Sequence, residues 1–244
     1  MFARIVVGYD GSEQSADALT LARLLAGEEG CITCHAVLKS APPVLHTLAE
    51  ELGADLIVVG STGRGRLGRA VPGTTADRLL HGGPCAVAVA PHGYHESAPD
   101  GLERVGAAYC AAPEATAALE LAYSIARTSA ARLEVIGAFE GAADVPERFG
   151  RLGIGEYVVN ARESAEGDLF DALSALNGAV TIDARLVDGH PAEVLIAQAR
   201  YLDLLVMGSR AHGPVNRALL GSVSHAVLLR SPCPVLVVPR GAVG

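Results

Sequence analysis

Residues Asp55–Pro91 read DLIVVGSTGRGRLGRAVPGTTADRLLHGGPCAVAVAP, and residues Asp203–Pro239 read DLLVMGSRAHGPVNRALLGSVSHAVLLRSPCPVLVVP. The two stretches align without a gap, 148 residues apart. In each, an apolar strand-like run ends at a glycine, a loop of small and polar residues follows, and a Gly-Thr or Gly-Ser pair precedes a helix-like run. Backbone amides at glycine turns and at helix starts suit a phosphate group. The repeat therefore predicts a duplicated fold and an anionic ligand.

The repeat continues outside this segment with a different offset. Arg4–Leu19 corresponds to Arg104–Leu119, 100 residues later, whereas Gly30–Leu38 corresponds to Gly178–Leu186, 148 residues later. The second copy therefore contains 48 residues, roughly Thr128–Leu176, that have no counterpart in the first.

Strand and helix patterns alternate along both copies. A helix is expected to begin at the N-cap Ser12 and to bury Ala18, Leu21, Ala22 and Leu25 on one face. The other expected strands are 4–9, 31–38, 55–59, 86–90 and 133–139, and the other expected helices are 43–52, 74–80 and about 158–176. Continuous apolar strands between helices indicate an α/β fold with parallel sheets covered on both faces.

We predict two domains from this pattern. The first, residues 1–92, has four strands; the second, residues 102–241, has five; and residues 93–101 form a linker by composition. The first domain therefore lacks one strand–helix unit.

Composition limits the functions that this chain can have. Its formal net charge is −8, half its residues are hydrophobic and 4% are aromatic. An acidic chain is a poor partner for nucleic acid or anionic membranes. No membrane span or signal peptide is recognisable, so a cytoplasmic location is expected.

Five cysteines do not make a disulfide framework. Cys31 and Cys34 form a CxxC in an expected strand, where residues three apart point to opposite faces. Ordinary buried thiols are favoured over metal or redox chemistry.

The first glycine segment supplies the candidate binding groups. Gly60 ends a strand, Gly63 and Gly65 permit positive φ, and Gly73-Thr74 opens a helix whose free amides suit an anion. Arg64 adds positive charge, as do Arg66 and Arg69. Asp10 ends the first strand, and if that strand is central, Asp10 and Gly60 lie on opposite sides of a ligand crevice.

These motifs resemble those of the universal stress protein family. The G-x2-G-x9-G-(S/T) spacing, the Asp of VVGYDGS and a terminal PVLVVP-like strand carry the resemblance, which covers nearly the whole chain and fits a tandem member. It implies Rossmann-like domains of strand order 3-2-1-4-5. It also implies that the domains pair as a pseudo-dimer through their last strands, Ala86–Ala90 and Pro234–Val238.

In one branch of that family the resemblance implies ATP binding, with or without magnesium. The Asp then contacts the nucleoside and the glycine loop holds the phosphates. Carried over to this chain, the roles fall on Asp10, Gly60, Thr62, Gly63, Arg64, Gly65, Gly73 and Thr74 and, more weakly, on Gly208, Arg210, Gly213, Gly221 and Ser222.

The second copy departs from this pattern. Cys110 stands in place of Asp10, and Ala211 in place of Gly63. Alanine at a position that needs positive φ costs about 1 kcal/mol. We therefore expect weak or no nucleotide binding there.

Simpler interpretations stay open. Asp10 could only cap a helix or close a turn, Gly73 and Gly221 could only allow tight packing, and the arginines could lie in a solvated loop. The GxGxxG match at Gly63–Gly68 lacks the acidic residue of a dinucleotide site. There is no GK(S/T) and no Ser-His-Asp order, so dedicated catalysis is not supported.

Three functions remain. The first is adenine-nucleotide binding with a regulatory or stress-tolerance role and at most slow, incidental ATP hydrolysis. The second is a structural or interaction protein in which the truncated first domain is an assembly surface. The third and weakest is an adenine-nucleotide hydrolase. Association of whole chains into a homo-oligomer is left open.

Overall fold

The structure is a computed structural model that describes residues 1–36, 41–61, 74–80, 83–140, 150–209 and 221–239. Strands and helices alternate along the chain, as predicted. The elements are β1 (Phe2–Tyr9), α1 (Glu13–Leu25), β2 (Ala26–Ala36), α2 (Ala41–Leu52), β3 (Leu56–Gly60), α3 (Thr74–Leu80), β4 (Ala86–Ala90), α4 (Tyr94–Ser97), β5 (Arg104–Tyr109), α5 (Pro113–Thr128), β6 (Arg132–Phe139), α6 (Gly150–Ser174), β7 (Ile182–Asp188), α7 (Pro191–Gln198), β8 (Leu204–Gly208), α8 (Ser222–Arg230) and β9 (Val235–Val238).

Among the described residues, nine strands form one sheet in the order β2-β1-β3-β4-β9-β8-β5-β6-β7. The strands within each half are parallel, and the halves meet where β4 pairs antiparallel with β9. Five strands of the second half follow the predicted 3-2-1-4-5 order, and the first half has the predicted four. The predicted pairing of Ala86–Ala90 with the last strand is confirmed.

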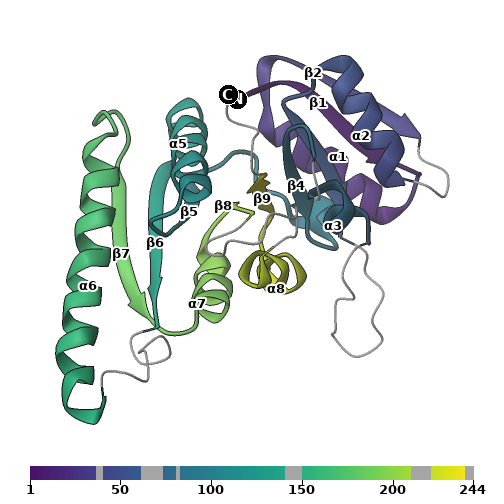
Figure 1. Cartoon of the computed structure of the whole chain (residues 1–244). Helices are drawn as coiled ribbons and strands as arrows, with labels where there is room; N and C mark the ends of the chain where they lie inside the picture. Colours follow the sequence, from purple (N-terminus) through teal and green to yellow (C-terminus); the bar gives the residue numbers. More distant parts are fainter. Residues whose placement is uncertain (37–40, 62–73, 81–82, 141–149, 210–220, 240–244) are drawn as a thin grey trace.

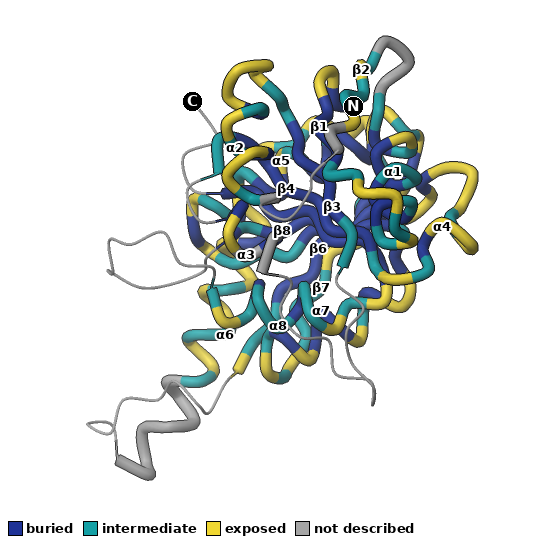
Figure 2. Tube along the Cα trace, turned by 90° about the vertical axis from the view of Figure 1, so that its right-hand side faces the viewer, coloured by how far each residue is buried: buried dark blue, intermediate teal, exposed yellow. Residues whose placement is uncertain are grey.

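Helices cover both faces of this sheet, and buried residues follow the strands through the middle of the molecule (Figures 1 and 2). Helices α1, α4, α5 and α6 contribute to the core on one face, and α2, α3, α7 and α8 to the core on the other. The predicted buried stripe of α1 is confirmed: Ala18, Leu21, Ala22 and Leu25 are fully buried.

The missing unit changes the position of β2. In the second half, β5 pairs with β6 and β6 with β7. In the first half, β2 pairs directly with β1, with Cys31 opposite Arg4, at the place that β6 occupies beside β5. The first half therefore ends one strand earlier, and the equivalent of α6 is absent from its described residues.

Equivalent aspartates fasten the amino ends of the two central strands. Asp55 accepts hydrogen bonds from the amides of Ala3 and Arg4, both at 2.9 Å. Asp203 does the same for Glu103 and Arg104, both at 2.8 Å. These contacts lie at the opposite end of the strands from the glycine loops.

Three expectations need correction or extension. Cys31 and Cys34 are exposed, not buried, because β2 is an edge strand that lacks the cover that β6 has. Helix α6 begins at Gly150, eight residues before the expected 158. The segment of linker composition contains α4, whose Tyr94 is buried.

Candidate functional site

Asp10 lies in the turn between β1 and α1, at the carboxyl end of the strand. Its Oδ1 accepts hydrogen bonds from the amide of Ser12, at 3.0 Å, and from the Ser12 hydroxyl. Ser12 is the N-cap of α1, as predicted, and its hydroxyl oxygen accepts from the amide of Ser15. The intervening Gly11 has φ +80°, which favours glycine. Asp10 therefore has the turn role that the sequence left open.

The same contacts keep Asp10 ionised. The Ser12 hydroxyl, and then its amide, hold the pKa of this carboxyl below its ordinary value. The residue is exposed to solvent. It presents a negative charge and hydrogen-bond acceptors at the end of β1.

Gly60 lets α1 approach the neighbouring strand. A Cβ on Gly60 would lie 2.0 Å from the carbonyl oxygen of Gln14, in the first turn of α1. Strands β1 and β3 are adjacent and parallel, with Val7 opposite Val58. The carboxyl end of β3, the first turn of α1 and Asp10 are therefore brought together.

This end of the strands is also where the direction of winding reverses. From β1 the chain passes along α1 to β2, on one side of β1. It returns along α2, on the opposite face, to β3 on the other side of β1. Doubly wound sheets bind ligands at such a reversal, beyond the carboxyl ends of the strands.

Several predicted site residues lie outside the described residues. These are Thr62, Gly63, Arg64, Gly65, Gly73, Arg210 and Gly213. Thr74 is described as the first residue of α3. Ser61, which the sequence analysis did not single out, donates from its amide to the carbonyl of Ala90, at 2.8 Å, and so fixes the start of the first loop.

The second half repeats much of this backbone arrangement. A Cβ on Gly208 would lie 2.8 Å from the carbonyl of Glu114 in α5, so Gly208 packs as Gly60 does. The amide of Ser209 donates to Val238, and the amide of Gly221 donates to the carbonyl of Ser209, at 2.9 and 2.8 Å.

Ser224 ties the two ends of the second loop together. Its hydroxyl donates to the carbonyls of Gly208 and Ser209, at 3.0 and 3.3 Å. Ser222 is exposed at the start of α8. The aligned Gly-Ser pairs, 60–61 and 208–209, were the signal in the sequence for Ser61 and Ser209.

Cys110 takes the place of Asp10 at the end of β5. Burial, and then the charge of Glu114, raise the pKa of its thiol. The N-cap position of α5 is Ala112, which makes no side-chain cap, and Pro113 follows it. This turn therefore offers a neutral thiol where the first half has a carboxylate.

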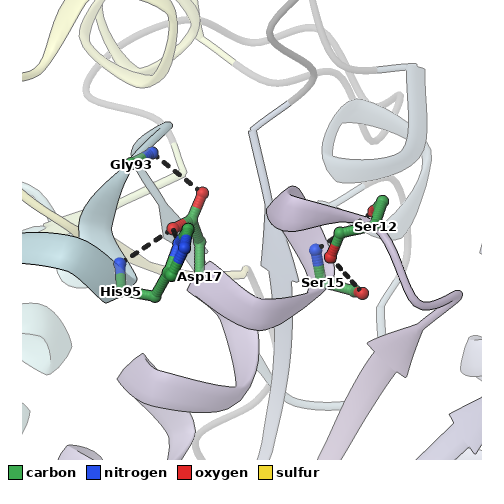
Figure 3. Close-up of polar contacts among 5 residues, drawn as sticks. All are labelled: Ser12, Ser15, Asp17, Gly93 and His95. Atoms are coloured by element: carbon green, nitrogen blue, oxygen red, sulfur yellow. Dashed lines mark hydrogen bonds and ion pairs between the residues drawn. The ribbon is translucent and has the colours of Figure 1, made fainter.

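Helix α1 is also anchored to the segment around α4, by a contact that was not predicted from the sequence. Asp17, fully buried in α1, accepts hydrogen bonds from the amides of Gly93 and His95, at 3.0 and 2.8 Å. Its Oδ1 lies 2.6 Å from Nδ1 of His95, and this contact raises the pKa of that imidazole. Figure 3 shows the Asp17 carboxylate beside α4 and, one turn earlier, the Ser12–Ser15 cap. Helix α1 is thus held at its N-cap, Ser12, and again at Asp17, one turn further along.

Other kinds of site find no support in the described part of the chain. It contains no cluster of three His, Cys, Asp or Glu side chains able to hold a metal ion. None of its helices is long and apolar enough to cross a membrane.

The described fold is that of a tandem, Rossmann-like α/β protein in which Gly60 and Ser61 lie at the reversal point of the sheet. The sequence model of the universal stress protein family matches residues 20–91 and 101–239. The chain belongs to the universal stress protein family.

One relative resembles this chain in sequence, and one solved structure resembles it in fold. A universal stress protein of Mycobacterium tuberculosis is 32% identical over 210 residues, which are 84% of this chain and 71% of the relative. A solved universal stress protein from Archaeoglobus fulgidus shares the fold over 98% of both chains, with a TM-score of 0.64 and 21% identity.

A further solved universal stress protein is a complex with cAMP. Its sequence is 27% identical to this one, and the matched region is 56% of this chain and 96% of the solved chain, with a TM-score of 0.37. The contact with cAMP is a property of that protein.

Proposed function

We propose that the first half of this chain binds an adenine nucleotide, with a regulatory or stress-tolerance role in the cytoplasm. One observation carries the proposal. The close approach of α1 to Gly60 gathers an ionised, exposed Asp10, the start of α1 and the start of the glycine loop at the reversal point of the sheet. A polar acceptor beside a phosphate-suited loop is what a nucleotide requires.

The groups present are chemically suited to such a ligand. Asp10 would accept hydrogen bonds from ribose hydroxyls or the base, since its carboxylate is ionised at neutral pH. In the roles that the family resemblance gives them, the amides of the loop from Thr62 to Gly65 and of Gly73-Thr74 would hold the phosphates. Arg64 would add positive charge.

The second half is proposed as the weaker site. Cys110 would meet a ribose with a neutral thiol, a poor hydrogen-bond acceptor. The retained Gly208 and Ser209 are explained by packing and by the loop's own hydrogen bonds. Their presence therefore does not support a second nucleotide.

One observation favours a second candidate, a non-binding assembly protein. Asp10 already accepts two hydrogen bonds from Ser12 and Gly60 already packs against α1, so both residues have structural reasons to be present. Under this interpretation the glycine segments are retained because the fold requires them, and they bind no ligand.

Two pairs of variants separate the candidates. Gly63→Val is compared with Ala211→Val, and Asp10→Asn with Cys110→Ala, because each control alters the equivalent position of the second half. Asp10→Asn keeps an oxygen that Ser12 can bond, so the turn is retained while the charge is lost.

The measurements are the nucleotide content of the purified protein and the thermal shift on adding ATP, ADP or AMP with magnesium. At about 100-fold the dissociation constant, a ligand stabilises the native state by about 2.7 kcal/mol. We expect this shift for the wild type and both controls, and its loss in Gly63→Val and Asp10→Asn. Absence of bound nucleotide and of any shift in the wild type would exclude nucleotide binding and leave the assembly function.

A further inference from the structure

Strand β2 is an open edge of the sheet. It pairs with β1 from Cys31 opposite Arg4 to Ala36 opposite Tyr9, and no described strand pairs with its outer side. The strand at the same position in the second half, β6, has β7 on that side. In Figure 1, β2 lies at the end of the sheet remote from α6.

The two ends of the sheet differ in how they are protected. The opposite edge, β7, carries Asp183, Arg185 and Asp188, and its Arg185 and Asp188 are ion-paired with Glu134 and Arg162. Charges on an edge strand discourage pairing with other chains. On β2, Glu28 and Glu29 lie near the amino end, and the segment Gly30–Cys34, GCITC, that follows them has no charged residue and no proline.

The exposed Cys34 of β2 contrasts with the buried residue at the same sheet position in β6. Cys34 lies opposite Val7, where the second half has Val135 opposite Ala107. Val135 is fully buried, whereas Cys34 is exposed. Cys31 is also exposed, on the other face of the strand. The edge is thus unpaired and exposes a cysteine on each face, while Ile32 between them is half-buried against the core that α1 covers.

We propose that β2 pairs antiparallel with β2 of a second copy of this chain across a twofold axis, which makes the sheet continuous through a dimer. The molecule already contains a join of this kind. Strands β4 and β9 unite the two halves antiparallel through the register pairs Val87–Val237, Ala88–Leu236 and Val89–Val235, which are uncharged. Segment Cys31–Ala36 is long enough for a similar join.

A second copy is favoured over other occupants because the pairing is self-complementary. In a twofold arrangement one strand supplies both sides of the interface, and the assembly closes at two subunits. The charged β7 edges then form the two outer ends, so the dimer does not extend into a fibre. The inference does not depend on nucleotide binding.

The test measures the molar mass of the purified full chain in solution, by light scattering or sedimentation, with reductant present to exclude disulfide-linked dimers. The double variant Cys31→Lys/Cys34→Lys puts two lysines on each β2 edge, and charges on an edge strand oppose its pairing with another chain. We expect it to weaken dimerisation by at least about 10-fold. The matched controls are Cys31→Ser/Cys34→Ser on the same strand and Ala184→Lys on exposed β7, and both should remain dimeric.

Hydrogen exchange of the wild type supplies a second measurement that needs no variant. Amides within residues 30–36 should gain protection as the protein concentration rises through the dimer dissociation constant, and amides of β7 should not. A wild type that is monomeric at about 100 μM, or a folded lysine double variant that stays dimeric, would overturn the proposal.

Discussion

Replacing Gly60 by alanine tests how the candidate site is built. The new Cβ would lie 2.0 Å from the carbonyl oxygen of Gln14, which is about 1.4 Å short of an ordinary contact of 3.4 Å. The obstacle is the backbone of the first turn of α1, so no side-chain rotation can relieve it. Either α1 or the end of β3 has to move.

The size of the effect follows from the overlap. Overfilling a packed core costs about 1–3 kcal/mol, while Gly→Ala returns about 0.4–1 kcal/mol by restricting the unfolded chain. Because the overlap at Gly60 involves backbone, we expect Gly60→Ala to lower the free energy of unfolding by about 3 kcal/mol. Gly208→Ala meets Glu114 at 2.8 Å and should cost about 1–2 kcal/mol.

The assay is urea unfolding followed by far-UV circular dichroism. Gly101→Ala is the matched control, because a Cβ there has nothing within 4 Å, and its stability should stay within about 0.5 kcal/mol of the wild type. If Gly60→Ala unfolds at the same urea concentration as Gly101→Ala, the close approach of α1 to β3 is not as described. A larger loss of unfolding free energy in Gly208→Ala than in Gly60→Ala would equally refute the reasoning.

Two further predictions concern ionisable groups. Contact with Asp17 raises the pKa of His95, so this contact stabilises the fold fully below the ordinary histidine pKa and loses its effect as the pH rises through the raised value. The difference in melting temperature between wild type and His95→Gln should therefore be larger at about pH 6 than at about pH 9, and an equal difference at both would contradict it. Thiol labelling of the native monomer should modify Cys31 and Cys34 rapidly, whereas Cys233, whose pKa burial raises to about 11, should react only after unfolding. Rapid labelling of Cys233 in the native protein would show that β9 is less well packed than described.

Much of the fold could be predicted because the two copies of the repeat can be compared with each other. The apolar runs determine the strands, and the change of offset between copies located the missing unit. Ser12 could be identified as an N-cap because a serine after a glycine turn, followed by an apolar stripe, has few other uses. The pairing of Ala86–Ala90 with β9 came from the family resemblance, since sequence periodicity does not report which strands are neighbours.

What could not be predicted depends on tertiary contacts. The GCITC run resembles a buried strand, and only its place at the end of the sheet exposes Cys31 and Cys34. Asp17 resembles a solvated helix residue, but three hydrogen bonds from residues 76 and 78 positions away allow it to be buried. The sequence motif identified Gly60 as a residue of the glycine segment, but its close contact with the backbone of α1 could not be predicted.

Comparison of the two halves separates the repeated residues that serve the fold from the residues that differ between the copies. Asp55 and Asp203 make the same bonds to strand amides, and Gly60 and Gly208 make the same close approach to a helix. These strand-end and close-packing positions are thus alike in both halves, whereas the hydrogen-bonded Asp10, Ser12 and Asp17 of the first half correspond to Cys110, Ala112 and Ala117. The positions that differ, Asp10 against Cys110 above all, lie where a ligand would be contacted and where the fold tolerates either residue. A duplicated glycine motif is therefore expected from packing alone, and the proposed nucleotide site is distinguished by residues that only the first half has, Asp10 above all.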